Sequence, residues 1–138
     1  MTDNLLTLKN LSVALPDGAD REFAIENISL ALQMGETVCV VGESGSGKSL
    51  TAKAIMGLLP APHVHVASGQ IIFDGEDLVQ VDYERLRRLR GSEISMIFQE
   101  PMTALNPVMT IGSQIDEIFR FHASMSSVER RAKAVELL

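Results

Sequence analysis

The sequence predicts an α/β fold, and three observations support this prediction. Residues 5–15 and 23–32 alternate apolar and polar side chains, which is typical of strands, and the Asp17-Gly18 turn signal between them favours an antiparallel pair. Residues 37–41, TVCVV, are continuously apolar, like a parallel strand buried on both faces, and this predicts a buried, inert Cys39. A glycine-rich stretch follows, and residues 49–59 then have helical propensity up to Pro60.

The middle of the chain predicts shorter elements. Residues 61–69 are typical of a loop, and residues 70–78 of a strand with a tight turn at Asp74-Gly75. Residues 82–90 predict a short basic helix with a solvated face, and residues 93–99 predict a second buried strand that ends at Gln99.

The last part of the chain predicts a loop over residues 100–110 and two helices. The first helix covers residues 111–122, and the second opens with a capping-box pattern from Ser126 to Glu129. No stop signal follows the apolar stripe of this last helix, so we expect the chain to be the first part of a longer protein. The stripe consists of Val128, Ala132, Val135 and Leu138.

The composition indicates a globular protein and excludes some functions. Of the 138 residues, 46% are hydrophobic and 22% are charged, which is the balance of a folded domain. The formal net charge of −6 disfavours binding to nucleic acid. No segment approaches the roughly 20 apolar residues of a membrane span, so we expect a cytosolic protein or one held at a membrane by a partner.

The glycine-rich stretch has the spacing of a phosphate-binding loop. Gly42 and Gly47 bracket four residues and are followed by Lys48 and Ser49, which matches G-x-x-x-x-G-K-[ST] between a predicted strand and a predicted helix. Glycines at these positions and at Gly45 let successive backbone N–H groups turn inward toward phosphates. Lys48 would neutralise phosphate charge, and the Ser49 hydroxyl would bind Mg²⁺.

Other residues leave alternatives to weigh. The N-K-x-D motif of guanine-binding proteins does not occur in the sequence. Asp74 ends an apolar run and could hold Mg²⁺ in a small phosphotransferase, but Asp74-Gly75 is also a hairpin signal, which we favour. His63 and His65 could touch a metal ion, but no third ligand lies near them in the sequence, which favours a solvated loop.

Three segments together resemble the ATP-binding subunits of ATP-binding cassette (ABC) importers, and within these the dipeptide, oligopeptide and nickel branch. They are VGESGSGKSLTAKAIMGLLP, LRRLRGSEISMIFQEP and MIFQEPMTALNPVMTIGSQI, and the resemblance extends through essentially all of the chain. It implies a P-loop NTPase fold with an N-terminal antiparallel β subdomain. Residues 1–111 would form the phosphate-loop core and residues 112–138 the beginning of a helical subdomain.

The resemblance also implies ATP and Mg²⁺ as cofactors and assigns roles to residues. Lys48 and Gln99 would be catalytic, and Ser49 and Gln99 would bind the metal ion. The nucleotide-binding residues would be Gly42, Ser44, Gly45, Ser46, Gly47, Lys48, Ser49 and Leu50. The family usually stacks adenine on an aromatic side chain where this chain has Leu15, and Phe23 is a possible substitute.

The implied partners are membrane permease subunits, contacted through the loop from Glu100 to Pro107, and a second ATP-binding subunit. A separate solute-binding protein would act indirectly, and the subunit would lie peripherally on the cytoplasmic face of the bacterial inner membrane. The implied activity is ATP hydrolysis coupled to solute import, with peptides as the expected solutes. The serine-glycine signature, the Walker B pair and the switch histidine of the family do not occur in this sequence, so we expect the 138 residues to bind nucleotide with little or no turnover. A non-catalytic module that docks on membrane subunits is the other alternative.

Overall fold

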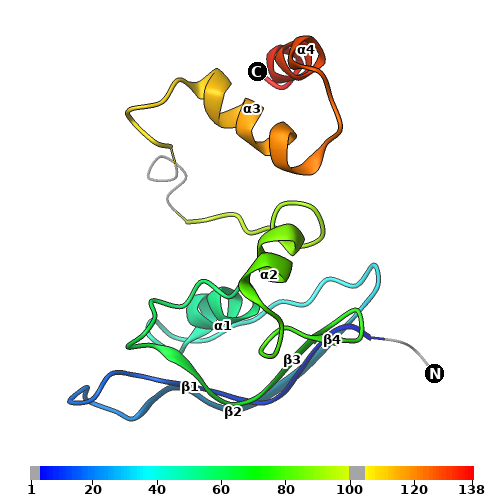
Figure 1. Cartoon of the computed structure of the whole chain (residues 1–138). Helices are drawn as coiled ribbons and strands as arrows, with labels where there is room; N and C mark the ends of the chain where they lie inside the picture. The colour runs from blue at the N-terminus through cyan, green and yellow to red at the C-terminus, as the bar shows by residue number, and fades with distance from the viewer. Residues whose placement is uncertain (1–3, 100–104) are drawn as a thin grey trace. The chain divides into compact units, whose positions relative to one another are not determined.

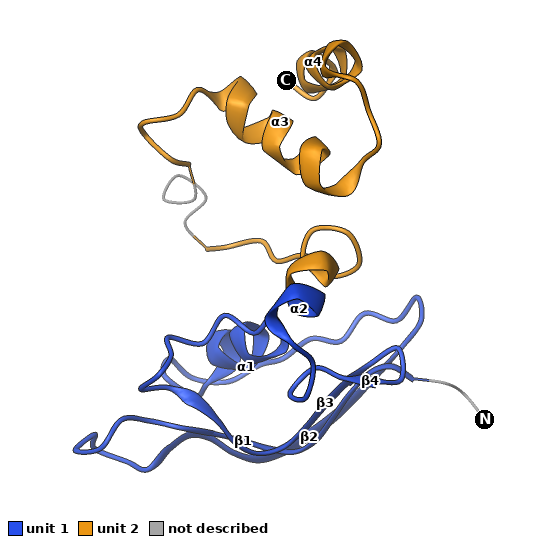
Figure 2. Ribbon diagram, viewed as in Figure 1, with its two compact units in different colours: residues 1–86 blue, residues 87–138 orange. Residues whose placement is uncertain are grey.

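The protein consists of two compact units in the computed structural model, which describes residues 4–99 and 105–138. The units comprise residues 1–86 and 87–138 (Figure 2). The boundary predicted after residue 111 separates two subdomains of the fold, whereas the boundary after residue 86 separates two compact units. The predicted boundary therefore stays a prediction.

The first unit is built on a four-stranded antiparallel sheet (Figure 1) with the order β2-β1-β3-β4. The strands are β1 (Asn4–Ala14), β2 (Phe23–Gln33), β3 (His65–Phe73) and β4 (Glu76–Asp77). The predicted antiparallel pair of β1 and β2 is confirmed. The prediction of a loop over residues 61–69 is wrong from His65 onward, because β3 begins there and pairs with β1.

A β-bulge in the centre of β1 decides which residues face the core. The pairing with β3 shifts between Lys9 and Ser12, and Asn10 has a positive φ of 48°. The extra residue moves the buried set of β1 by one position, so that the alternation continues on the same face after a break. The buried apolar side chains of this strand are Leu6, Leu8, Leu11 and Val13.

Gly69 in β3 lies against this bulge. A Cβ atom at this position would lie 2.5 Å from the carbonyl oxygen of Asn10 and 2.6 Å from the Cα atom of Leu11. Its φ of 92° is also in the region that favours glycine. The bulged strand can therefore approach β3 this closely only at a glycine.

Helix α1 (Lys48–Ile55) packs against β2 and β3 and lies over one face of the sheet (Figure 1). The prediction that this helix continues to Pro60 is wrong, because it ends in a Schellman motif at Gly57, which has a φ of 61°. In this motif Leu58 N–H donates to the carbonyl of Lys53 at 2.8 Å, and Gly57 N–H donates to that of Ala54 at 3.0 Å.

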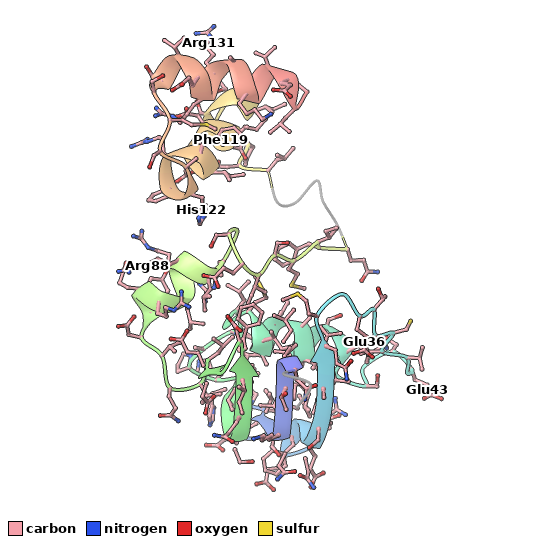
Figure 3. The ribbon with its side chains drawn as sticks, turned by 90° about the vertical axis from the view of Figure 1, so that its right-hand side faces the viewer. Glu36, Glu43, Arg88, Phe119, His122 and Arg131 are labelled. Atoms are coloured by element: carbon pink, nitrogen blue, oxygen red, sulfur yellow. The ribbon has the colours of Figure 1, made fainter. Side chains whose placement is uncertain are left out.

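The two predicted buried strands at residues 37–41 and 93–99 do not form. Val41 is 84% exposed and Ile97 is 96% exposed, and Cys39, which we expected to be buried, is also exposed. Glu36 and Glu43, which flank the first of these runs, are exposed as well, and Figure 3 shows Glu43 at the edge of the ribbon. A parallel strand needs hydrogen-bonded neighbours and covered faces, and the sheet of the described residues includes neither run.

The three helices after β4 form where the sequence predicts them. Helix α2 (Tyr83–Leu89) begins after Asp82, whose carboxylate accepts a hydrogen bond from Arg85 N–H at 2.7 Å. Helices α3 (Ile111–His122) and α4 (Ser127–Glu136) pack together within the second unit. None of the helices in the described ranges has the length and apolar character that a membrane crossing needs.

An ion pair between Asp116 and Arg130, with a distance of 2.6 Å from Oδ1 to Nε, joins α3 to α4. The predicted apolar stripe of α4 faces solvent, since Val128 is 77% exposed and Leu138 is 81% exposed. The buried residue of α4 is Ala134 instead.

The close approach at Gly69 predicts that a methyl group is not tolerated there. We expect Gly69→Ala to lower the free energy of unfolding by about 2–4 kcal/mol, since it combines backbone strain with overpacking. Gly75→Ala is the matched control, because Gly75 also has a positive φ, of 81°, but has nothing within 4 Å of a Cβ. Urea unfolding, followed by circular dichroism, gives the free energy of unfolding of both variants. An equal loss of this free energy in the two variants would contradict the steric argument.

The capping box of α4 is confirmed and predicts an acid-sensitive helix end. The Ser126 hydroxyl and backbone N–H, with distances of 2.7 and 2.8 Å to Glu129 Oε2, lower the pKa of Glu129 below its usual value of 4.5. A carboxylate with a lowered pKa stabilises the folded helix at pH values above about 4.5, and the contribution is lost as the pH falls through the folded-state pKa.

An NMR titration of the Glu129 carboxyl carbon, together with the Ser126 amide, measures this effect. Glu129→Gln should remove the pH dependence of the Ser126 amide shift. Glu117→Gln, which removes a carboxylate from α3 and leaves the cap unchanged, should preserve it. A Glu129 midpoint at or above 4.5 would refute the prediction.

Candidate functional site

The glycine-rich stretch forms a loop around the side chain of Lys48, the first residue of α1. The Lys48 ammonium donates hydrogen bonds to the carbonyl oxygens of Gly42 at 2.7 Å and Glu43 at 2.6 Å. It also donates to the Ser46 hydroxyl at 3.3 Å. The loop thus carries a positive charge at its centre, as the sequence predicts.

Gly47 packs this loop directly against the start of β2. It is buried, has a φ of 94° and precedes the first residue of α1. A Cβ atom at Gly47 would lie 2.9 Å from the carbonyl oxygen of Ala24 and 3.0 Å from Cγ1 of Ile25, both at the start of β2. A Cβ atom at Gly42 would lie 2.7 Å from the Ser46 hydroxyl oxygen. The approach at Gly47 is to backbone, so glycine is required there, whereas a Cβ at Gly42 would need the Ser46 hydroxyl to turn away.

The start of α1 suits an anion. The first turn contains no acidic residue, and no side chain caps it. The first N–H groups of a helix have no partner within the helix, and the helix dipole places partial positive charge there. Together with the Lys48 ammonium, the Ser49 hydroxyl and the open backbone at Gly45, this donor set fits a polyphosphate that carries a hard cation such as Mg²⁺.

The other predicted nucleotide-binding residues lie in the same loop and helix. Ser44, Ser46 and Ser49 are exposed, and Leu50 is half-buried in the first turn of α1. The structure therefore brings the predicted phosphate-binding residues together. Their roles toward a nucleotide stay predictions.

Gln99 is exposed at a bend in the second unit, whereas the phosphate loop is in the first. Its approach to the phosphate loop therefore stays a prediction. Most of the predicted permease-contacting loop lies outside the described residues. Its last part is bonded to α3, because the side chain of Gln114 accepts from Asn106 N–H at 2.9 Å and donates to the Asn106 carbonyl at 3.1 Å.

Asp74 occupies a hairpin turn rather than a position at the end of a buried parallel strand. Asp74 and Gly75 both have positive φ, of 47° and 81°, as in a type I′ turn between β3 and β4. The backbone N–H of Asp74 donates to the carbonyl of Leu5 at 2.9 Å. The hairpin interpretation is confirmed.

His63 and His65 were considered as metal ligands. Among residues 4–99 and 105–138, which include these two histidines, no three His, Cys, Asp or Glu side chains lie close enough together to hold a metal ion.

Two contacts of the loop were not predicted from the sequence. The Thr51 hydroxyl donates to the carbonyl of Gly47 at 3.0 Å, and Arg21 Nη2 donates to the carbonyl of Gly45 at 2.9 Å. Arg21 lies 24 residues before Gly45, in the β1–β2 loop, and no motif pairs them. Leu15 and Phe23, the two residues considered for adenine stacking, are half-buried at the two ends of this same loop.

Known proteins resemble this chain in both sequence and structure. The family model described as ABC transporter matches residues 25–138. The peptidoglycan transport ATP-binding protein YejF of Agrobacterium fabrum is 47% identical over 99% of this chain and 25% of its own length. The oligopeptide transport ATP-binding protein OppD of Bacillus subtilis is 44% identical over 97% of this chain and 37% of its own length.

The solved structures agree with the sequence relatives. The dimeric structure of MJ0796, a bacterial ABC transporter cassette, superposes with a TM-score of 0.77 at 28% identity and covers 95% of this chain and 54% of that one. A second MJ0796 structure, a post-hydrolysis state bound to ADP and Pi, has a TM-score of 0.76. The chain spans about half of these solved chains and less than half of the curated relatives named above.

The fold predicted from the sequence, a P-loop α/β nucleotide-binding domain with an antiparallel β subdomain, is confirmed by these neighbours. Because the family model matches residues 25–138 and these residues include a phosphate loop closed around Lys48, this chain belongs to the ABC transporter family and is part of an ATP-binding domain of that family.

Proposed function

We propose that this chain binds Mg-ATP as part of a subunit that couples ATP hydrolysis to the import of peptides or similar solutes. The observation that carries the proposal is the loop of residues 42–47 closed around the Lys48 ammonium, at 2.6–2.7 Å from two backbone carbonyls. Such a loop at the start of a helix is suited to the phosphates of a nucleotide.

The individual residues would divide the work of binding. Lys48 would exchange its carbonyl partners for β- and γ-phosphate oxygens, which are stronger acceptors because they are charged. The backbone N–H groups from Ser44 to Leu50 would donate to the phosphates. The Ser49 hydroxyl and the Gln99 amide oxygen would hold Mg²⁺, which would neutralise developing phosphate charge. We propose Lys48 and Gln99 as the residues of this chain that act in catalysis.

Peptide-like solutes are supported by the names of the relatives, which include oligopeptide and dipeptide transport proteins of Bacillus subtilis. In our proposal the selectivity for the solute belongs to membrane permease subunits and a separate solute-binding protein. The permease subunits would contact the loop from Glu100 to Pro107 on the cytoplasmic face of the inner membrane. A second ATP-binding subunit would complete the site, in line with the dimeric MJ0796 cassette.

The 138 residues alone should bind nucleotide with little turnover. Their sequence contains no serine-glycine signature, no apolar strand that ends in an Asp-Glu pair and no switch histidine of the family pattern. A purified chain that hydrolyses ATP at on the order of 1 s⁻¹ or more would contradict this part of the proposal.

Titration calorimetry with Mg-ATP tests nucleotide binding. We expect Lys48→Ala to weaken binding roughly ten- to hundredfold, because a charge-assisted hydrogen bond to phosphate is lost. Lys53→Ala is the matched control, since it removes an equal charge from the last turn of the same helix and should leave the affinity nearly unchanged. If the wild-type chain does not bind Mg-ATP, or if the two lysine variants lose the same amount of affinity for it, the proposed role of the loop is wrong.

Asp74→Asn in the same experiment addresses the alternative of a small phosphotransferase that uses Asp74 for Mg²⁺. We expect unchanged affinity, because Asp74 lies in a hairpin turn. A Mg²⁺-dependent loss of affinity would favour the phosphotransferase instead. For the second alternative, a non-catalytic docking module, Lys48→Ala would leave binding to permease subunits unchanged with or without ATP.

A further inference from the structure

The β1–β2 loop reaches the phosphate loop through one side chain. The guanidinium of Arg21 donates from Nη2 to the carbonyl oxygen of Gly45 at 2.9 Å. The β1–β2 loop has a defined shape, because Leu15 N–H donates to the carbonyl of Glu22 at 2.9 Å and Ala19 N–H donates to that of Pro16 at 3.1 Å. Arg21 is therefore presented to the phosphate loop by a closed hairpin end.

The glycine at the start of the peptide group that Arg21 contacts adds no steric restraint to it. Gly45 has a φ of 80°, and a Cβ atom there would meet nothing within 4 Å. A glycine in open space can rotate its neighbouring peptide planes at low cost. Without Arg21, the Gly45–Ser46 peptide would lose the bond to its carbonyl and keep the bond of its N–H to Glu43.

The other end of the same peptide group is bonded inside the loop. The N–H of Ser46 donates to the carbonyl of Glu43 at 3.2 Å, next to the Lys48 ammonium, which donates to the same carbonyl at 2.6 Å. A peptide plane that is bonded at both its carbonyl and its N–H has a fixed orientation. Here it directs the Ser46 N–H toward the interior of the loop and the carbonyl outward to Arg21.

The charge on Arg21 reinforces this orientation. A hydrogen bond from a guanidinium is stronger than one from a neutral donor, and it polarises the peptide so that the N–H at the other end becomes a better donor. The effect is local, because Arg21 acts on the outer side of the loop and does not need to touch a ligand.

We propose that Arg21 is a positioning residue for phosphate binding, which holds the Gly45–Ser46 peptide so that the Ser46 N–H stays directed into the loop, where it would exchange the Glu43 carbonyl for a nucleotide phosphate. This inference rests on the proposed function, because it assigns a role in the same nucleotide site. Arg21 acts through the loop and is not a catalytic residue.

Arg21→Ala in the 138-residue chain is the direct test, with Mg-ATP and Mg-ADP as probes. We expect both affinities to fall by a similar factor, roughly three- to thirtyfold, because the bond restrains the loop and not the γ-phosphate. Arg21→Lys keeps a charged donor and should recover part of the loss. Lys9→Ala removes an equal charge from β1, away from the phosphate loop, and should leave both affinities unchanged. An Arg21→Ala affinity equal to that of the wild type, or an equal loss in Lys9→Ala, would overturn the inference.

Amide hydrogen exchange of Ser46, measured without nucleotide, separates this inference from the proposed function. We expect the Ser46 amide to exchange faster in Arg21→Ala than in the wild type, while the thermal midpoint stays nearly the same because Arg21 is exposed. A chain that fails to bind Mg-ATP but shows this faster exchange would refute the proposed function and with it the role of Arg21 in phosphate binding, and would leave only the restraint of the Ser46 peptide by Arg21. Unchanged exchange in a chain that binds Mg-ATP would refute the role of Arg21 alone.

Discussion

The first unit depends on the pairing of β1 at both of its edges. This strand is the one to which both long partners attach, so its register determines where β2 and β3 lie. The bulge at Asn10 changes the phase of the buried side chains in the middle of the strand, and the partner strand accommodates it with Gly69. A sheet of this kind tolerates an extra residue only where the neighbouring backbone can approach closely.

The phosphate loop takes its shape from the same sheet. Gly47 lies against the carbonyl of Ala24 at the start of β2, and Arg21, just before that strand, bonds to Gly45. Two points of the loop therefore contact the end of the β1–β2 hairpin. Within the loop, the Lys48 ammonium donates hydrogen bonds to the carbonyls of Gly42 and Glu43. The antiparallel sheet thus positions the phosphate loop, even though the pattern of the loop can be identified without any reference to the sheet.

The exposed apolar runs show how strongly strand formation depends on neighbours. Residues 37–41 have the composition of a buried strand, yet Val40 is 54% exposed and Val41 is 84% exposed. Residues 93–99 behave similarly, and the pairing in this region is a single bridge between Arg90 and Ile94. Local composition favours an extended chain in both runs, but a parallel sheet exists only when several strands, distant in sequence, supply each other's hydrogen bonds.

The features that could be predicted from the sequence depend on local chemistry: the phosphate-loop spacing, the Asp74-Gly75 turn, the capping box at Ser126 and the approximate bounds of the helices. Each of these follows from a few consecutive residues, because backbone conformation and side-chain capping act over short distances. The end of α1 at Gly57 was also local, but the competing signal of Pro60 obscured it. The bulge, the extent of β3, the exposure of the two apolar runs and the bond from Arg21 to Gly45 could not be predicted, because they depend on which distant segments lie side by side in the folded chain.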